Sequence, residues 1–217
     1  MTLPQASETP TWRGRMHEAA FFVSVPAGIV LVLAARSLTA RVAAIVYASS
    51  LAAMFGASAA YHRLPWSPRS RRRMKRLDHS MIFVLIAGTY TPIALLVLHG
   101  TFAIVLLCLV WVGALAGIAL KVLKVDGLKA ASGALYVALG WLAILATPQF
   151  VHGLSGLALG LLFAGGLLFT TGAIVLATHR PDPSPRVFGY HEVWHSMVVG
   201  ACFCHYVVIL LVLQSFR

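Results

Sequence analysis

The sequence predicts an all-α membrane protein, a seven-transmembrane helix bundle that forms a single membrane domain over residues 1–217. Hydrophobic residues make up 59% of the chain and charged residues only 11%. The mean hydropathy is +0.85, and seven apolar runs are long enough to cross a membrane. The 6 carboxylates are too few to solvate the surface of a water-soluble protein of this size, so a soluble globular fold is excluded.

About 20 apolar residues are needed to cross the ~30 Å hydrocarbon core of a membrane. The third and fourth runs are separated only by His99 and Gly100, and the fifth and sixth by a few residues around Pro148 and His152. Seven spans are therefore expected. In chain order, the helices are expected at residues 18–37, 42–62, 77–98, 101–120, 130–148, 154–178 and 191–214.

Lys and Arg are distributed unevenly between the two sides of this predicted bundle. All but three of the 17 basic residues precede the first helix or lie in the second, fourth and sixth connections, the exceptions being Arg36, Arg41 and Arg217. Because short cytoplasmic segments carry an excess of basic residues, we expect the N-terminus inside and the C-terminus outside. The chain is therefore expected to be a multi-pass protein of the cell (inner) membrane.

The densest basic stretch, Arg69–Arg76, lies between the second and third predicted helices. We interpret it as a short loop whose partner is anionic lipid headgroups on the cytoplasmic side. A nucleic-acid patch is the alternative interpretation, but the stretch has no interleaved aromatic residues, so no nucleic-acid partner is expected. The formal net charge of +11 follows from the same orientation bias.

Histidine, carboxylate and hydroxyl side chains recur in three segments beside the apolar runs. These are residues 58–62 at the end of the second helix, residues 77–80 at the start of the third and residues 191–195 at the start of the seventh. Ionisable groups near membrane helix ends are costly and usually persist where they are paired, coordinated or functional. The orientation inferred above puts all three segments in the cytoplasmic leaflet, so we expect them to meet.

Residues four apart lie on one face of a helix, one turn apart. His191 and His195 have this spacing, so both imidazoles can reach one ion, and His62 adds a third nitrogen ligand. Three histidines leave a fourth position open, as in a catalytic Zn2+ site, although copper, nickel or iron are not excluded by ligand type. His205 lies about 21 Å deeper than His191 at 1.5 Å per residue, and is expected to be an internal hydrogen-bonding group.

Two carboxylates compete for the role of the general base. Asp78 is expected to take a proton from the attacking water, with Ser58 positioning that water or polarising a substrate carbonyl. Alternatively, Asp78 caps its helix or pairs with the basic stretch, and Ser58 bonds its own helix backbone. The segment His191–His195 also matches H-E-x-x-H, the metalloprotease signature in which the glutamate is the base, so Glu192 is the rival of Asp78.

In combination, these residues resemble the hemolysin III family, bacterial relatives of the progestin and adipoQ receptors, which include the adiponectin receptors. The resemblance covers nearly the whole chain. It rests on Ser58 with His62, on Leu77-Asp78-His79-Ser80 running into Ala87-Gly88-Thr89-Tyr90-Thr91-Pro92, and on His191 with His195 followed by Gly200 and His205.

The resemblance implies a seven-helix bundle with an intramembrane zinc near the cytoplasmic face. By matched position, His62, His191 and His195 would be the metal ligands, and Asp78 and Ser58 the pair that positions water. The wider superfamily includes ceramidases, which implies a zinc-dependent hydrolase of lipid amides or esters that serves membrane homeostasis. Its partner would be a membrane lipid, as substrate or ligand.

Three other functions remain open on the sequence. A receptor-like or membrane-sensing protein would hold a structural zinc, and an intramembrane metalloprotease would use Glu192. A cytolytic pore needs a polar stripe of pore length, whereas the deep polar residues here are isolated. One part of the family pattern also differs, because the family commonly has Glu-x-x-Asn-x-x-Thr-His in its first helix. Here Glu18 is followed by Phe21, Ser24 and Val25, so the Asn and His of that pattern are absent.

Overall fold

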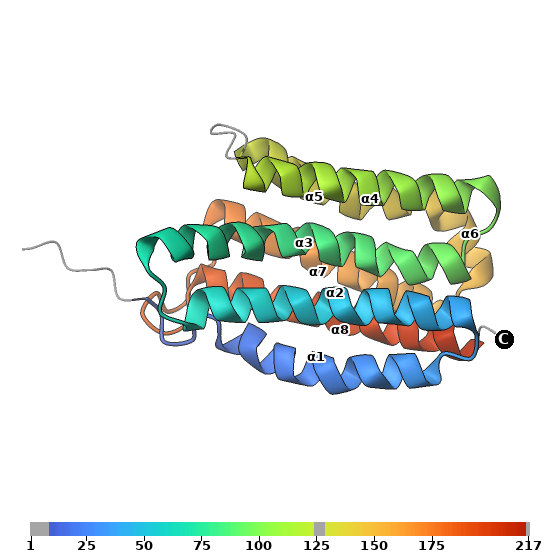
Figure 1. The fold of residues 1–217 in the computed structure, drawn as a ribbon, viewed down its shortest axis with the longest axis horizontal. Helices are drawn as coiled ribbons and strands as arrows, with labels where there is room; N and C mark the ends of the chain where they lie inside the picture. Colours follow the sequence, from blue (N-terminus) through green and yellow to red (C-terminus); the bar gives the residue numbers. More distant parts are fainter. Residues whose placement is uncertain (1–8, 124–128, 216–217) are drawn as a thin grey trace, which may run out of the picture.

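The structure is a computed structural model that describes residues 9–123 and 129–215, and all regular secondary structure within those ranges is helical (Figure 1). Seven stretches of the described chain are long and apolar enough to cross a membrane, which confirms the predicted all-α, seven-helix class. The helices are α1 (Arg15–Ala34), α2 (Leu38–Arg63), α3 (Pro68–Leu96), α4 (Gly100–Val122), α5 (Lys129–Trp141), the 3₁₀ helix η1 (Leu142–Ala146), α6 (Thr147–Gly153), α7 (Gly156–Thr178) and α8 (Tyr190–Ser215).

Consecutive spans run in opposite directions, so the connections alternate between the two ends of the bundle (Figure 1). One end carries the start of α1, the α2–α3 connection and the α7–α8 connection, while α8 finishes at the other. We call the first of these the basic end, because Arg15, Arg63 and Arg186 lie there. Within the bundle α3 is central, since it contacts α2, α4, α5 and α8.

The fifth span is divided, whereas a single helix was expected at residues 130–148. It consists of α5, η1 and α6 in succession. Pro148 explains the division, because it has no N–H to donate to the carbonyl of Ile144. That carbonyl instead accepts from the backbone N–H of Thr147 and from its hydroxyl at 2.7 Å, which produces the tighter 3₁₀ turn.

The stretch Arg69–Arg76 is helical, so its interpretation as a loop was wrong. Helix α3 begins at Pro68, nine residues before the apolar run that predicted it. Ser67 caps the helix by accepting a bond from the backbone N–H of Ser70 at 3.3 Å, and proline is favoured at the first helical position. Hydropathy marks where a helix enters the membrane, whereas the cap decides where it begins.

The bundle is polar inside at only a few points and apolar on its outer faces. Large apolar side chains such as Phe22, Leu33 and Ile104 are 68%, 79% and 66% exposed, as expected of surfaces in contact with lipid. Inside, single polar groups bridge neighbouring spans, which is a common way to stabilise helix pairs in membranes. These bonds run from the Tyr90 hydroxyl to Leu139 O at 2.9 Å, from the Tyr206 hydroxyl to Ala27 O at 3.0 Å and from Trp111 Nε1 to Thr91 Oγ1 at 3.2 Å.

Candidate metal centre

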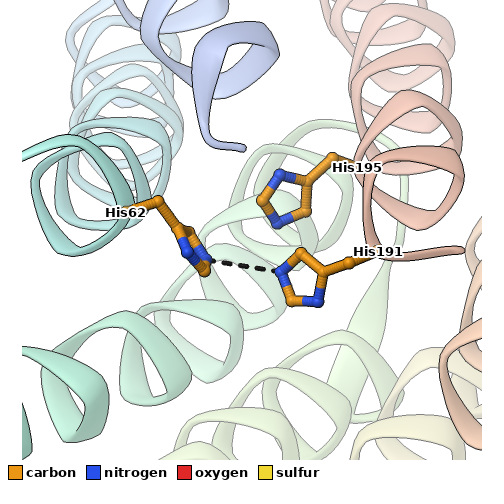
Figure 2. Close-up of side chains that lie close together, drawn as sticks. All are labelled: His62, His191 and His195. Carbon is orange, nitrogen blue, oxygen red and sulfur yellow. Dashed lines mark hydrogen bonds between the residues drawn. The ribbon is translucent and has the colours of Figure 1, made fainter. Parts of the chain in front are cut away.

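Three histidines from two helices converge at the basic end of the bundle. His62 is in the last turn of α2, and His191 and His195 lie one turn apart at the start of α8. Figure 2 shows the three imidazoles pointing toward one another across the gap between these helices. The prediction that the ends of the second and seventh spans meet here is therefore confirmed.

The spacing of two of these imidazoles matches that of ligands on one metal ion. Each residue offers one ring nitrogen, and these nitrogens lie within 4.8 Å of one another. The Nε2 atoms of His62 and His191 are 3.4 Å apart (Figure 2). Two nitrogens bound to one tetrahedral zinc, at about 2.0–2.1 Å each, are about 3.3–3.4 Å apart. The pair is thus spaced as two ligands of a single ion would be.

His195 supplies an independent test of whether a metal fits. Its side chain is 1% exposed, and its buried Nε2 atom has no hydrogen-bond partner among the described residues. A buried polar atom without a partner is destabilising, and a metal ion would remove that cost. The group formed by His62, His191 and His195 can therefore hold a metal ion, and no fourth His, Cys, Asp or Glu among the described residues joins it.

Asp78 lies beside this group, although not at the start of its helix as expected. Because α3 begins at Pro68, Asp78 is in its third turn, and the helix cap is Ser67. The carboxylate is close enough to interact electrostatically with His17 and His62. Asp78 is 9% exposed, and within the described residues its ion pair is with Nδ1 of the adjacent His79 at 3.4 Å. The alternative that Asp78 caps α3 was wrong.

Glu192 is occupied by other groups. Its side chain is 1% exposed, and its Oε1 atom is 2.7 Å from Nε of Arg13. Its Oε2 atom accepts a bond from the backbone N–H of Gly189 at 3.0 Å. Oε2 thus caps the start of α8 itself, whereas Oε1 ties that start to the segment before α1. That segment also lies close to α2, because a Cβ at Gly14 (φ +76°) would be 2.6 Å from the Cβ of His62.

His17 belongs to the site, and sequence reasoning missed it. It lies in the first turn of α1 and is 2% exposed. Its Nδ1 atom is hydrogen-bonded to Ser58 Oγ at 2.8 Å, and its ring is stacked on that of His195, with centroids 3.7 Å apart and planes 12° apart. The sequence did carry a signal, because His17 stands at the same predicted membrane face as the other three histidines.

The remaining candidates lie outside the cluster. Glu18 is an exposed partner of Arg63, whose Nε lies 3.1 Å from its Oε2. The first helix therefore contributes a histidine at position 17 and no carboxylate. Nε2 of His205 lies 3.3 Å from Leu162 O on α7, which confirms that His205 is an internal hydrogen-bonding group. Ser58, 2% exposed, bonds His17 and not its own helix backbone.

Comparisons with known proteins agree with the motifs. A family model described as Haemolysin-III related matches residues 5–206. Hemolysin-3 of Bacillus cereus is 34% identical over 187 residues, which cover 85% of this chain and 82% of that protein. The Hemolysin-3 homolog of Bacillus subtilis (strain 168) is 33% identical over 187 residues, covering 85% and 84%. The family match includes all three histidines of the cluster.

Proposed function

The chain belongs to the haemolysin III family, and on this premise, together with the three-histidine cluster, we propose that it is an integral-membrane, zinc-dependent hydrolase of a lipid amide or ester. The observation that carries the proposal is the three-histidine group, which has no fourth protein ligand among the described residues and so resembles catalytic zinc sites, where three protein ligands leave one position open. A membrane role follows from the seven apolar spans.

In this proposal His62, His191 and His195 hold the zinc ion. When bound, zinc supplies a Lewis acid that polarises a carbonyl oxygen and lowers the pKa of a coordinated water toward ~7. Neutral imidazoles suit this metal, and the burial of His195 excludes competing solvent from one side of the site.

Asp78 and Ser58 are the two groups that we propose to act on water and substrate. The Asp78 carboxylate accepts a proton from the attacking water and later returns it to the leaving group. Among the described residues it has no ion pair with Lys or Arg, so its oxygens remain available to the water. The Ser58 hydroxyl, fixed by its bond to His17, orients the water or the carbonyl.

A lipid is the proposed substrate because of where the cluster lies. It is at the basic end of spans whose outer faces carry exposed apolar side chains. An amide or ester at headgroup depth can reach these residues while its acyl chain stays in the membrane. A lipid amide bond also matches the ceramidase-like chemistry that the family resemblance implies.

The alternative of a receptor-like protein with a structural zinc is less favoured. Structural zinc sites have four protein ligands, whereas the described residues supply three here. An intramembrane protease that uses Glu192 is also less favoured, because both carboxylate oxygens of Glu192 are engaged by Arg13 and Gly189.

Metal analysis of the purified protein is the first test. We expect about one zinc per chain in the wild type and in His205→Ala, a control that removes a histidine outside the cluster. Most of the zinc should be lost in each of the three cluster variants, His62→Ala, His191→Ala and His195→Ala. A chelator should lower the melting temperature of the zinc-containing wild type and leave that of the zinc-free variants unchanged. Full zinc retention by all three cluster variants would refute the site.

Hydrolysis of a panel of lipid amides and esters, in detergent or bilayer discs, is the second test. Zinc-loaded wild type should release fatty acid from at least one member, and chelated protein should not. A zinc-loaded protein that hydrolyses none of them would count against the enzyme and in favour of the structural-zinc alternative.

A further inference from the structure

His17 is a buried residue of α1 that contacts both of the other helices at the metal centre. It joins α1 to Ser58 on α2 through the 2.8 Å bond between Nδ1 and Oγ, and it stacks on His195 of α8 at 3.7 Å. Its ring also meets the edge of Phe55, with centroids 5.1 Å apart. One buried side chain therefore contacts both a proposed ligand and the hydroxyl next to the site.

From these contacts we infer that His17 is a positioning residue for the metal centre. The inference rests on the metal site of the proposed function. A metal ligand is effective only when its ring plane directs the nitrogen at the ion, and neighbouring groups usually set that plane. Here the stacked ring of His17 covers one face of His195 and prevents the imidazole from tilting toward α1.

His17 also positions the Ser58 hydroxyl, through the hydrogen bond between the two side chains. Serine in a helix ordinarily bonds the carbonyl three or four residues earlier, which would turn its hydroxyl away from the neighbouring helix. His17 replaces that bond, so the Ser58 hydroxyl faces α1 and the site. Without His17, both the His195 ring and the Ser58 hydroxyl become free to adopt other rotamers.

The test measures metal affinity and the visible spectrum of the cobalt-substituted protein, since neither depends on hydrolysis. His17→Ala should weaken zinc binding roughly 10–100-fold, as loss of a group that orients a ligand does, and should change the cobalt spectrum. His17→Phe, which keeps a stacking ring, should recover most of the affinity. His205→Ala is the matched control and should leave both readouts unchanged.

Wild-type affinity and an unchanged cobalt spectrum in His17→Ala would overturn the positioning role. If His17→Ala does not fold, the same two measurements are made on His17→Gln and His17→Phe. Wild-type zinc affinity and a wild-type cobalt spectrum in both variants would show that the imidazole is not needed, and would overturn the positioning role. Failure of the proposed metal site would look different, since His62→Ala would then bind metal as the wild type does.

A second inference concerns the basic face of α3, which comprises Arg69, Arg72, Arg73 and Arg76. Their i, i+3, i+4, i+7 spacing puts them on one side of the helix, and they line an open hollow of about 250 Å³. None of the four forms an ion pair within the described ranges. Arg71 points elsewhere, with its guanidinium 5.4 Å from the Tyr61 ring centroid.

One of these arginines, Arg69, also stands at an unfavourable place for a cation, because it lies in the first turn of α3. The N-terminus of a helix carries a partial positive charge, and the first turn of α3 has no acidic residue to balance it. A bound anion would relieve both this and the repulsion among the guanidinium groups. Guanidinium groups bind phosphate through paired N–H donors, and lipid headgroups lie at the depth where a membrane helix leaves the bilayer.

The geometry thus points to a site for the phosphate of an anionic phospholipid headgroup on this face. Binding of short-chain phosphatidylglycerol to the detergent-solubilised protein tests it. Arg69→Gln/Arg73→Gln should weaken binding roughly tenfold or more. The charge-matched control Arg180→Gln/Arg186→Gln removes two exposed arginines from the same end of the bundle and should weaken it far less.

Equal losses in the two double variants would show that only net charge matters and would overturn the site. Two further measurements use inorganic phosphate as a competitor and phosphatidylcholine as a net-neutral alternative ligand. Displacement of the lipid by millimolar inorganic phosphate would assign the hollow to a free anion instead, and equal affinity for phosphatidylcholine would exclude charge recognition.

Discussion

At the scale of single residues, the proposed chemistry depends on which carboxylate near the histidines is not already paired with a cation. The sequence motifs left two candidates for the general base, Asp78 and Glu192. Both are buried beside the histidines, so burial does not distinguish them. The difference lies in their partners. Glu192 is held by a guanidinium and a backbone N–H, whereas the ion pair of Asp78 within the described residues is with the adjacent His79. A carboxylate already engaged by a cation is a poor proton acceptor, so Asp78 is the base that we propose.

This difference gives a prediction for paired isosteric variants. Asp78→Asn should keep zinc and lose turnover about 100-fold or more, the usual contribution of a general base. Glu192→Gln should instead weaken the pair with Arg13 and cost about 1–3 kcal/mol of stability. Turnover, zinc content and melting temperature would be measured together. Loss of turnover only in Glu192→Gln, with a normal melting temperature, would reverse the assignment.

At the scale of helices, the close packing of α2 on α3 brings His62 and Asp78 together. Gly88 of α3 faces Ser50 of α2, and a Cβ at Gly88 would collide with the Ser50 side chain. Only glycine lets the two backbones come this near, as in other membrane helix pairs with small residues at the contact. The spacing of the two helices at mid-membrane therefore affects the geometry at their basic ends.

A glycine pair tests this dependence. Gly88→Ala should destabilise the protein by about 1–3 kcal/mol through overpacking, and Gly88→Ala/Ser50→Gly should recover part of the loss. Gly160→Ala is the matched control, since nothing lies within 4 Å of a Cβ there. The readout is thermal unfolding in detergent, with zinc content measured on the same samples. A harmless Gly88→Ala would mean that α2 and α3 can separate without cost.

At the scale of the whole molecule, the histidine cluster and most basic residues share one end of the bundle. If basic residues mark the cytoplasmic side, the cluster opens toward the cytoplasm, and its substrate comes from the inner leaflet. The distribution of basic residues between the two ends is what carries this expected orientation.

Labelling of single cysteines in intact cells tests the orientation. In a chain whose Cys108, Cys202 and Cys204 are replaced by alanine, Thr101→Cys should react with an impermeant thiol reagent from outside. Arg186→Cys should react only after lysis, because it lies at the opposite end of the bundle. The reverse pattern would place the cluster at the outer face.

Much of the fold was predictable because membrane spans are governed by a local quantity, the length of an apolar run. The divided fifth span and the early start of α3 were not, since backbone donors and caps at Pro148 and Ser67 act independently of hydropathy. In the site, the i, i+4 spacing of His191 and His195 and the sidedness of His62 were enough to predict that these three could meet.

The sequence by itself determined the class, the number of spans and the three histidines, because helical period and hydropathy are properties of neighbouring residues. Only the tertiary structure decided that His17 joins the site, that Glu192 pairs with Arg13 and that Asp78 has no Lys or Arg partner among the described residues. These contacts link segments more than forty residues apart, and their existence depends on how the helices are rotated and spaced. The rotation of each helix about its axis depends on side chains from distant parts of the chain that pack against it, so no local sequence pattern determines it.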